Sequence, residues 1–178
     1  MTRALFLDRD GVINEDYGHV FKIKDFVFIS GIFELIKKAY DLNMKIFVIT
    51  NQAGIGRGFY DEEDFQILNK WMCQQFEEVG TPINKVYFCP THPNHGLGHY
   101  KRIDNFRKPA PGLILKARDE FDIDLSSSIL VGDKSTDIIA GNRANVGLNI
   151  LLSDSSDDEL SSYSYKLVQS LDEVIPFL

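Results

Sequence analysis

The sequence contains few of the residues and segments that fasten a chain with disulfides or anchor it in a membrane. Only two of its 178 residues are cysteines, Cys73 and Cys89, which are too few for a disulfide framework. No apolar run approaches the ~20 residues that a transmembrane helix needs. The opening segment MTRALFLDRD lacks the apolar core of a signal peptide. We therefore expect a cytoplasmic protein with no membrane partner.

Positive charge is also scarce. The chain has 19 lysines and arginines against 26 aspartates and glutamates, which gives a net charge of −7. Nucleic-acid-binding proteins usually carry a basic surface, so we expect no nucleic-acid partner. Hydrophobic residues make up 44% and charged residues 25% of the chain, a balance typical of globular proteins. We expect residues 1–178 to form a single domain and a monomer.

Short apolar runs alternate with longer stretches of helical period along the chain. The runs are almost continuously apolar, which is typical of strands covered on both faces of a parallel sheet. The expected strands cover residues 4–7, 45–50, 85–88, 128–131 and 148–152. The expected helices cover residues 32–42, 61–79, 111–121, 135–144 and 170–178. This alternation predicts a doubly wound, mostly parallel α/β sheet with helices on both faces.

Two segments interrupt this alternation. Residues 89–109 combine prolines, glycines and histidines without any periodicity, and so long a loop in a compact domain is usually functional or metal-bound. Residues 154–164 are polar and acidic, and we expect them to form a solvated loop. No long insertion follows Asp10 or Thr50, so we expect no separate cap domain.

The most informative motif is Asp8-Arg9-Asp10-Gly11-Val12, directly after the first expected strand. In open α/β sheets, ligands bind beyond the carboxyl ends of the strands, so both aspartates would open onto the binding crevice. One carboxylate could attack a phosphorus atom there while the other transfers a proton. The alternative is an aspartate-rich turn that caps the next element.

Polar residues at other strand ends favour the catalytic interpretation. Thr50-Asn51 ends the second expected strand, and the segment GDKSTD, residues 132–137, follows the fourth. Arg107-Lys108 lies in the irregular segment. A phosphate among carboxylates needs cations to neutralise the charge, and aspartate oxygens suit Mg²⁺ rather than a soft metal. Taken singly, the segment GDKSTD could cap the next helix, and Arg107-Lys108 could be a solvated basic pair.

In the order DRDGV, TNQ, RKP and GDKSTD, these motifs resemble those of the haloacid dehalogenase superfamily of phosphohydrolases, over nearly the whole chain. The segments TNQAGIGRGFY, CPTHP and FRKPAPG are similar to those of its heptose bisphosphate phosphatases. The resemblance implies hydrolysis of the C7 phosphate of D-glycero-D-manno-heptose 1,7-bisphosphate, in the synthesis of nucleotide-activated heptose for bacterial surface polysaccharide. The alternatives are hydrolysis of histidinol phosphate or another small sugar phosphate, and a catalytically silent scaffold.

The resemblance also implies roles for the acidic residues. Asp8 would be the nucleophile that forms an aspartyl-phosphate, and it would bind Mg²⁺. Asp10 would protonate the leaving oxygen and then activate water, with its backbone carbonyl facing the metal. Asp133 would be the remaining Mg²⁺ ligand from the protein, with Lys134 beside it and Asp137 in support.

The same resemblance implies a set of phosphate-binding and substrate-binding residues. Thr50 and Lys108 would hold the transferring phosphoryl group, and Arg107 would bind the substrate. The other residues expected to contact the substrate are Arg9, Asp16, His19, Asn51 and Gln52.

The irregular segment departs from the pattern of the resembled family. There, a Cys-x-His pair and a Cys-x-Cys pair before the Arg-Lys pair usually hold a structural zinc ion. Here Cys89 is present, but Thr91, Asp104 and Phe106 stand at the other three positions. We therefore expect the usual zinc site to be absent.

A rearranged zinc site is the alternative for this segment. A Cys-x2-His-x2-His spacing is compatible with tetrahedral zinc. The residues of such a site would be Cys89, His92, His95 and His99. Otherwise these histidines belong to an ordinary loop beside prolines and glycines.

Overall fold

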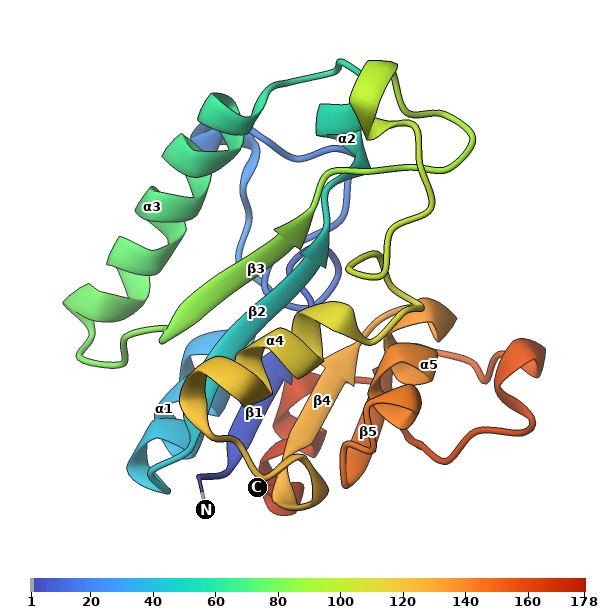
Figure 1. The fold of residues 1–178 in the computed structure, drawn as a ribbon. Helices are drawn as coiled ribbons and strands as arrows, with labels where there is room; N and C mark the ends of the chain where they lie inside the picture. Colours follow the sequence, from blue (N-terminus) through green and yellow to red (C-terminus); the bar gives the residue numbers. More distant parts are fainter. Residues whose placement is uncertain (1) are drawn as a thin grey trace.

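The computed structural model describes residues 2–178 and contains a six-stranded sheet in which all neighbouring strands are parallel. The strands are β1 (Ala4–Leu7), β2 (Lys45–Asn51), β3 (Lys85–Cys89), β4 (Ile129–Gly132), β5 (Leu148–Leu152) and β6 (Lys166–Val168). Their order is β3-β2-β1-β4-β5-β6, so the chain winds outward from β1 in both directions (Figure 1). This arrangement confirms the predicted doubly wound α/β fold.

Helices cover both faces of the sheet. They are α1 (Ile32–Asp41), α2 (Ala53–Gly56), α3 (Glu62–Glu78), α4 (Gly112–Phe121) and α5 (Ser135–Arg143). The helices α1 and α3 pack on one face, and α4 and α5 pack on the other. Short 3-10 helices cover Ile23–Asp25, Gly98–Tyr100, Leu125–Ser127, Asp158–Leu160, Leu171–Glu173 and Ile175–Phe177.

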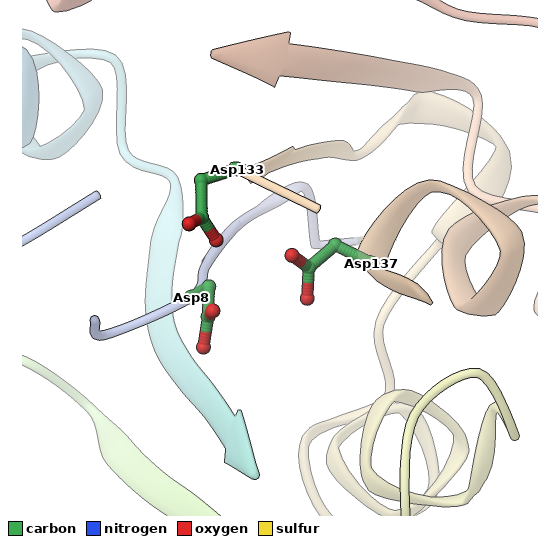
Figure 2. Close-up of side chains that lie close together, drawn as sticks. All are labelled: Asp8, Asp133 and Asp137. Carbon is green, nitrogen blue, oxygen red and sulfur yellow. The ribbon is translucent and has the colours of Figure 1, made fainter. Parts of the chain in front are cut away.

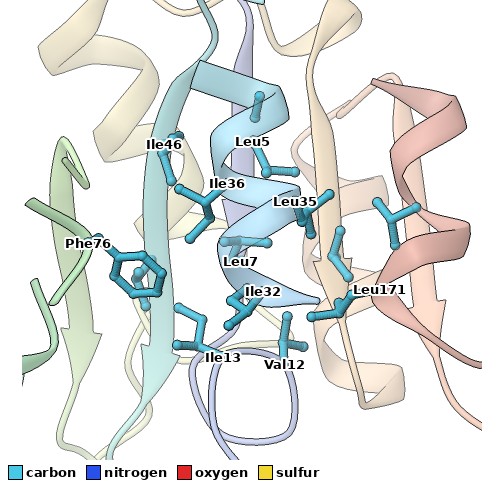
Figure 3. Packing of buried hydrophobic residues seen from close by; sticks show 14 of the residues in the cluster. Leu5, Leu7, Val12, Ile13, Ile32, Leu35, Ile36, Ile46, Phe76 and Leu171 are labelled. Atoms are coloured by element: carbon cyan, nitrogen blue, oxygen red, sulfur yellow. The ribbon is translucent and has the colours of Figure 1, made fainter. Parts of the chain in front are cut away.

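The central strand β1 is anchored in two apolar layers. Leu5 and Leu7 join the layer beneath α1, as Figure 3 shows, whereas Ala4 and Phe6 join the layer beneath α4 and α5. All four side chains are fully buried. Burying each large one stabilises the fold by roughly 1.5–3 kcal/mol. The acidic turn that follows β1 is therefore attached to one of the most firmly held parts of the molecule.

Local sequence signals explain where the helices begin. Asp61 caps α3, because its carboxylate accepts a hydrogen bond from the backbone N–H of Asp64. The carboxylate of Asp64 in turn accepts a hydrogen bond from the backbone N–H of Asp61. The helix α1 follows Gly31, which has a φ of +87°, a conformation that glycine adopts without strain.

The prediction of a C-terminal helix at residues 170–178 is wrong, because two short 3-10 helices take its place. Pro176 lacks the N–H that a continuous α-helix would need at that position. The sequence analysis also missed β6, a three-residue edge strand in which only Val168 is buried. The acidic loop at 154–164 contains a 3-10 helix and buries Leu160 completely.

The other predicted elements are present with ends displaced by at most one residue. Within residues 2–178, the chain after Asp10 and after Thr50 forms loops and short helical turns rather than a separate cap domain. None of the helices described in this range is both long and apolar enough to cross a membrane.

Candidate active site

The polar residues predicted to be functional lie where three neighbouring strands end. Asp8 follows β1, Thr50 lies near the end of β2, and Asp133 follows β4. Because these strands are adjacent and parallel, their carboxyl ends share one edge of the sheet. Asp137 reaches the same place from the first turn of α5. The topology therefore gathers side chains that are far apart in sequence.

Asp8, Asp133 and Asp137 form a carboxylate cluster (Figure 2). Each offers an oxygen that lies within 4.8 Å of an oxygen from each of the others. Gly11 lies directly against this cluster with a φ of +93°, and a Cβ at that position would clash with the carboxylate of Asp133. The glycine of the DRDG motif is therefore required both by its backbone conformation and by the space that Asp133 occupies.

The Lys108 side chain lies against these carboxylates and is only 2% exposed. Its Nζ lies 2.8 Å from Asp8 Oδ1 and 2.5 Å from Asp137 Oδ1, and it donates to the carbonyl of Ile49 at 2.8 Å. Asn51 holds the backbone of Lys108, because its side-chain amide accepts from Lys108 N and donates to Lys108 O, each at 3.1 Å. The ammonium thus lies against three oxygen atoms of the protein, two of them from carboxylates.

The electrostatics of the cluster favour binding of a further cation. Burial raises the pKa of Asp8 to about 8, and the charges of Asp137 and Asp133 add to this effect, while Lys108 opposes it. Burial likewise raises the pKa of Asp133, although Lys134 opposes the shift. The pKa of Lys108 is also raised, because the carboxylates of Asp137 and Asp8 outweigh the cost of its burial. One buried ammonium therefore balances only part of the charge of three carboxylates.

The donor set fits a hard divalent cation. Asp133 Oδ1 is buried and has no hydrogen-bond partner among residues 2–178, an arrangement that costs free energy unless a ligand occupies the site. Carboxylate oxygens are the ligands that Mg²⁺ prefers. The predicted ligand set contained Asp10 with Asp137 in support, whereas the clustered carboxylates include Asp137 and not Asp10.

The carboxylate of Asp10 is held beside the cluster by three side-chain donors. Its Oδ1 accepts from Arg9 Nη2 at 2.8 Å and from Asn14 Nδ2 at 3.1 Å. Its Oδ2 accepts from Gln52 Nε2 at 2.9 Å. The side chain keeps 16% of its surface exposed, so a group in the cavity could still exchange a proton with it.

The structure corrects the prediction that Arg9 contacts substrate. Its side chain is 1% exposed, donates to Asp10 and to the carbonyl of Val20, and lies over the ring of Phe65. It does not line the cavity described below. Arg9 instead orients Asp10 from behind, which the sequence could not distinguish from a substrate contact because both residues belong to the same turn.

An open cavity of about 350 Å³ lies over these groups. The predicted catalytic and substrate-binding residues that line it are Asp8, Asp10, Asp16, His19, Asn51, Gln52, Arg107 and Lys108. Thr50 is 1% exposed and contacts the lining through its hydroxyl, which accepts from Gln52 Nε2 at 2.8 Å. Tyr60 and Thr136 also line the cavity. Both lie in segments that the sequence analysis quotes, TNQAGIGRGFY and GDKSTD, but it assigned neither of them a role.

A salt bridge joins two sides of the cavity rim. Lys134 Nζ lies 2.9 Å from Asp16 Oδ2 and 3.3 Å from Asp133 Oδ2. Partial burial disfavours the charge of Asp16, but hydrogen bonds from Lys134 and from the backbone N–H of Gly18 lower its pKa. Lys134 therefore connects the loop after β1 to the loop after β4.

Aromatic and basic side chains lie at another part of the rim. The rings of His19 and Phe59 have centroids 4.7 Å apart, and the guanidinium of Arg57 lies 4.7 Å from the centroid of Phe59. Arg57 Nη1 also lies 3.4 Å from His19 Nε2. The sequence analysis recognised His19 but missed Arg57 and Phe59, which the short helix α2 brings to the same place.

The irregular segment is tied to the sheet by contacts within the protein. Cys89 is buried, with its Sγ 3.1 Å from Thr91 Oγ1, and Arg107 Nη1 donates to the carbonyl of Thr91 at 2.9 Å. Asp104 pairs with Arg102, and the half-exposed ring of Phe106 lies 5.7 Å from the ammonium of Lys116. These contacts occupy the positions at which the resembled family has zinc ligands.

The four alternative zinc residues do not converge on one point, although the rings of His92 and His95 have centroids 4.8 Å apart. His92 Nδ1 accepts from the backbone N–H groups of Asn94 and His95, and the ring of His99 lies 3.9 Å from that of Tyr100. In the part of the chain that the structure describes, no three of the alternative ligands have their ligand atoms within 4.8 Å of one another. Those four residues are Cys89, His92, His95 and His99.

Comparisons with known proteins identify the family of this chain. A family model described as polynucleotide kinase 3 phosphatase matches residues 5–162. A D-glycero-alpha-D-manno-heptose-1,7-bisphosphate 7-phosphatase of Burkholderia mallei is 54% identical over 99% of this chain and 94% of its own length. The chain belongs to the heptose bisphosphate phosphatase family.

A second relative and a solved structure extend the comparison. A D-glycero-beta-D-manno-heptose-1,7-bisphosphate 7-phosphatase of Vibrio cholerae is 45% identical over 84% of this chain and 80% of its own length. The solved structure is the crystal structure of a D,D-heptose 1,7-bisphosphate phosphatase from B. bronchiseptica, complexed with magnesium and phosphate. It matches 99% of this chain over 97% of its own length. Its TM-score is 0.81 at 21% identity, so this match supports the fold alone. The resemblance predicted from the sequence motifs is confirmed.

Proposed function

We propose that the protein hydrolyses the C7 phosphate of D-glycero-D-manno-heptose 1,7-bisphosphate, in the synthesis of nucleotide-activated heptose for bacterial surface polysaccharide. The observation that carries this proposal is the position of Asp8 and Asp10, which line one cavity with Lys108 in a chain 54% identical to such a phosphatase. The proposal includes a monomeric enzyme of the cytoplasm, where free thiols such as those of Cys73 and Cys89 are usual.

The first half of the reaction transfers the phosphoryl group to Asp8. Lys108 and the backbone N–H of Arg9 both contact Asp8 Oδ1, which leaves Oδ2 as the attacking atom. Oδ2 forms a bond to phosphorus while the bond from phosphorus to the C7 oxygen breaks. Asp10, in its protonated form, gives its proton to that oxygen, so the sugar leaves as an alcohol.

The second half of the reaction hydrolyses the aspartyl-phosphate. The Asp10 carboxylate takes a proton from water as the water oxygen attacks phosphorus. The bond between phosphorus and Asp8 then breaks, which releases inorganic phosphate and restores both carboxyl groups to their starting states. Lys108 and the hydroxyl of Thr50 would hold the phosphoryl oxygens, because phosphoryl transfer depends mainly on positioning and charge neutralisation.

Asp8, Asp133 and Asp137 would hold Mg²⁺, and the backbone carbonyl of Asp10 remains a predicted fourth contribution. When bound, the ion would neutralise charge on the phosphate and on the surrounding carboxylates. The unpartnered Asp133 Oδ1 and the shortage of positive charge in the cluster support this assignment.

A small sugar phosphate suits this cavity. Its volume of about 350 Å³ lies at the lower end of the range for small-molecule sites. Arg107, Lys134 and His19 line it together with Asp16, and they would meet the sugar and its second phosphate. The description of the matching family model names a polynucleotide phosphatase, but a net charge of −7 disfavours a nucleic-acid substrate.

We also propose that residues 89–109 fold without zinc. The contacts of Cys89 with Thr91 and of Arg107 with the Thr91 carbonyl support this proposal, because they join the segment to the sheet without an ion. Elemental analysis of protein purified without a histidine tag should find far less than one zinc per chain. Stoichiometric zinc would contradict the proposal.

The function is tested by steady-state kinetics with Mg²⁺ on four substrates: the α and β anomers of the heptose bisphosphate, histidinol phosphate and a 3′-phosphorylated oligonucleotide. We expect kcat/KM for one heptose anomer to exceed that for the last two by at least about tenfold. Asp8→Asn should lower kcat by about 10³-fold or more, because it removes the nucleophile. Equal, slow turnover of all four substrates would contradict the heptose assignment, and full activity of Asp8→Asn would contradict the mechanism.

A further inference from the structure

A chain of buried hydrogen bonds leads from Tyr60 to the carboxylate of Asp10. The hydroxyl of Tyr60 donates to Gln52 Oε1 at 2.5 Å. The amide nitrogen of Gln52 then donates to Asp10 Oδ2 at 2.9 Å and to Thr50 Oγ1 at 2.8 Å. Gln52 therefore joins the residue proposed to move protons to the residue proposed to hold the phosphoryl group. Neither Gln52 nor Tyr60 has a part in the reaction steps described above.

The orientation of the Gln52 amide decides whether this chain can form. An ionised carboxylate only accepts hydrogen bonds, so the amide nitrogen of Gln52 must face Asp10. A reversed amide would place an oxygen against the carboxylate and leave Thr50 Oγ1 without its donor. The Tyr60 hydroxyl supports the observed orientation because it donates to the amide oxygen, which faces away from Asp10. Burial raises the pKa of Tyr60 to about 12, so the hydroxyl stays protonated at neutral pH.

The surroundings of Tyr60 hold its ring in one place. Tyr60 is 6% exposed, and its ring stacks on Phe21 with centroids 4.9 Å apart and an interplanar angle of 7°. Gly54 lies against the same ring, so that even a Cβ at position 54 would collide with it. The position of the hydroxyl is thus set by packing on both sides. A small change at either residue 54 or residue 60 should disturb it.

We propose that Tyr60, acting through Gln52, is a positioning residue that aims Asp10 at the leaving oxygen. This inference rests on the proposed function, in which Asp10 protonates the alcohol that leaves. Tyr60 contacts no reacting atom in this scheme. Its effect should therefore appear only where protonation of the leaving group limits the rate.

The test compares leaving groups in the Tyr60→Phe variant, which removes the hydroxyl and keeps the ring. The quantity measured is kcat/KM, which covers the steps up to release of the alcohol and leaves out hydrolysis of the aspartyl-phosphate. Heptose 1,7-bisphosphate and glycerol 1-phosphate release poor alkoxide leaving groups, whereas p-nitrophenyl phosphate releases a phenolate that needs little protonation. We expect kcat/KM to fall about tenfold or more on both alkyl phosphates and less than about twofold on p-nitrophenyl phosphate.

Three further variants make the result specific. Tyr87→Phe is the matched control, because Tyr87 is also buried, its hydroxyl donates to Glu120 of α4, and neither residue lines the cavity. It should change none of the three values. Gly54→Ala should reproduce the pattern of Tyr60→Phe by displacing the ring. Gln52→Met should reproduce it too, and it serves as the second variant if Tyr60→Phe folds poorly.

Other patterns would overturn the inference. Equal losses on all three substrates would indicate general damage to the site, and a loss on heptose bisphosphate alone would make Tyr60 a substrate contact. Asp10→Asn is the reference variant. If it lowers kcat/KM equally for all three substrates, the proposed role of Asp10 fails. If it shows the leaving-group preference and Tyr60→Phe does not, only the role of Tyr60 fails.

Discussion

Two lysines at this edge of the sheet each lie between two aspartates, and they differ mainly in exposure. Lys108 contacts Asp8 and Asp137 with 2% of its side chain exposed, whereas Lys134 contacts Asp16 and Asp133 with 53% exposed. Lys108 is also fixed through its backbone by Asn51. The two ion-pair clusters therefore use the same chemistry in different surroundings.

The difference between the two lysines lies in what water does to their ion pairs. Around Lys134, solvent screens the charges, and such pairs contribute only about 0–1 kcal/mol. Around Lys108, water is excluded, so each charge has lost its hydration and depends on the others for compensation. The buried cluster should therefore control stability and chemistry, and the exposed pair should mainly tune the shape of the rim. Three predictions test this comparison.

The largest expected effect follows from Lys108→Met, which removes the ammonium and keeps most of the side-chain volume. Asp8 and Asp137 would then lose their buried cation, with only the exposed Lys134 left beside Asp133, and breaking such a buried pair usually costs about 3–5 kcal/mol. Denaturant unfolding of the metal-free protein measures the change in the free energy of unfolding. If the free energy of unfolding falls by less than about 1 kcal/mol, Lys108 and Lys134 contribute equally to stability, and exposure does not distinguish them.

A middle-sized effect concerns pH. The pKa of Asp8 is raised from 3.8 to about 8 in the folded protein, so the folded state binds more protons than the unfolded state between these values. The contribution of Asp8 to stability is therefore present at low pH and is lost as the pH rises toward about 8. From pH 5 to pH 8, the free energy of unfolding of metal-free Asp8→Asn should rise relative to the wild type by about 1–3 kcal/mol.

Two outcomes check that second prediction. Saturating Mg²⁺ should reduce the difference between wild type and Asp8→Asn at pH 8, because a cation favours the ionised carboxylates. The opposite slope, with the wild type gaining stability over Asp8→Asn as the pH rises, would show that Lys108 alone compensates the cluster.

The smallest expected effect follows from Lys134→Met, the exposed counterpart of Lys108→Met. Its free energy of unfolding should change by less than about 1 kcal/mol, because both of its ion pairs are screened by solvent. Since Lys134 lines the cavity, KM for the heptose bisphosphate should rise several-fold more than kcat falls. A destabilisation as large as that of Lys108→Met would refute the role that we assign to exposure.

Much of the fold was predictable because its local signals agree with its tertiary structure. The almost continuous apolar runs form the central parallel strands, because a strand covered by helices on both faces buries the side chains on both of its sides. The edge strand β6 could not be found in the same way, because only Val168 of its three residues is buried. A C-terminal helix was predicted for residues 170–178, but Pro176 lacks the N–H that a continuous helix would need there.

The site was predictable to the extent that its residues are carried by motifs. Asp8, Thr50 and Asp133 come together because the ends of adjacent strands must share an edge, and their motifs mark those ends. Lys108 reaches them from the irregular segment. Arg9 was misassigned because the sequence does not show which side of a turn faces the cavity. Tyr60 was missed because its importance depends on a contact with Gln52 that only packing creates.

The sequence by itself determined the parallel α/β class and which residue types meet at the carboxyl ends of the strands. Both follow from the spacing of apolar residues within short segments of the chain, which needs no tertiary contact to recognise. Only the tertiary structure decided that Asp137 joins the carboxylate cluster, that Arg9 lies behind Asp10, and that Lys108 is buried while Lys134 is exposed. The physical reason is that hydration and distance set the strength of a charge, and both depend on segments far apart in the sequence.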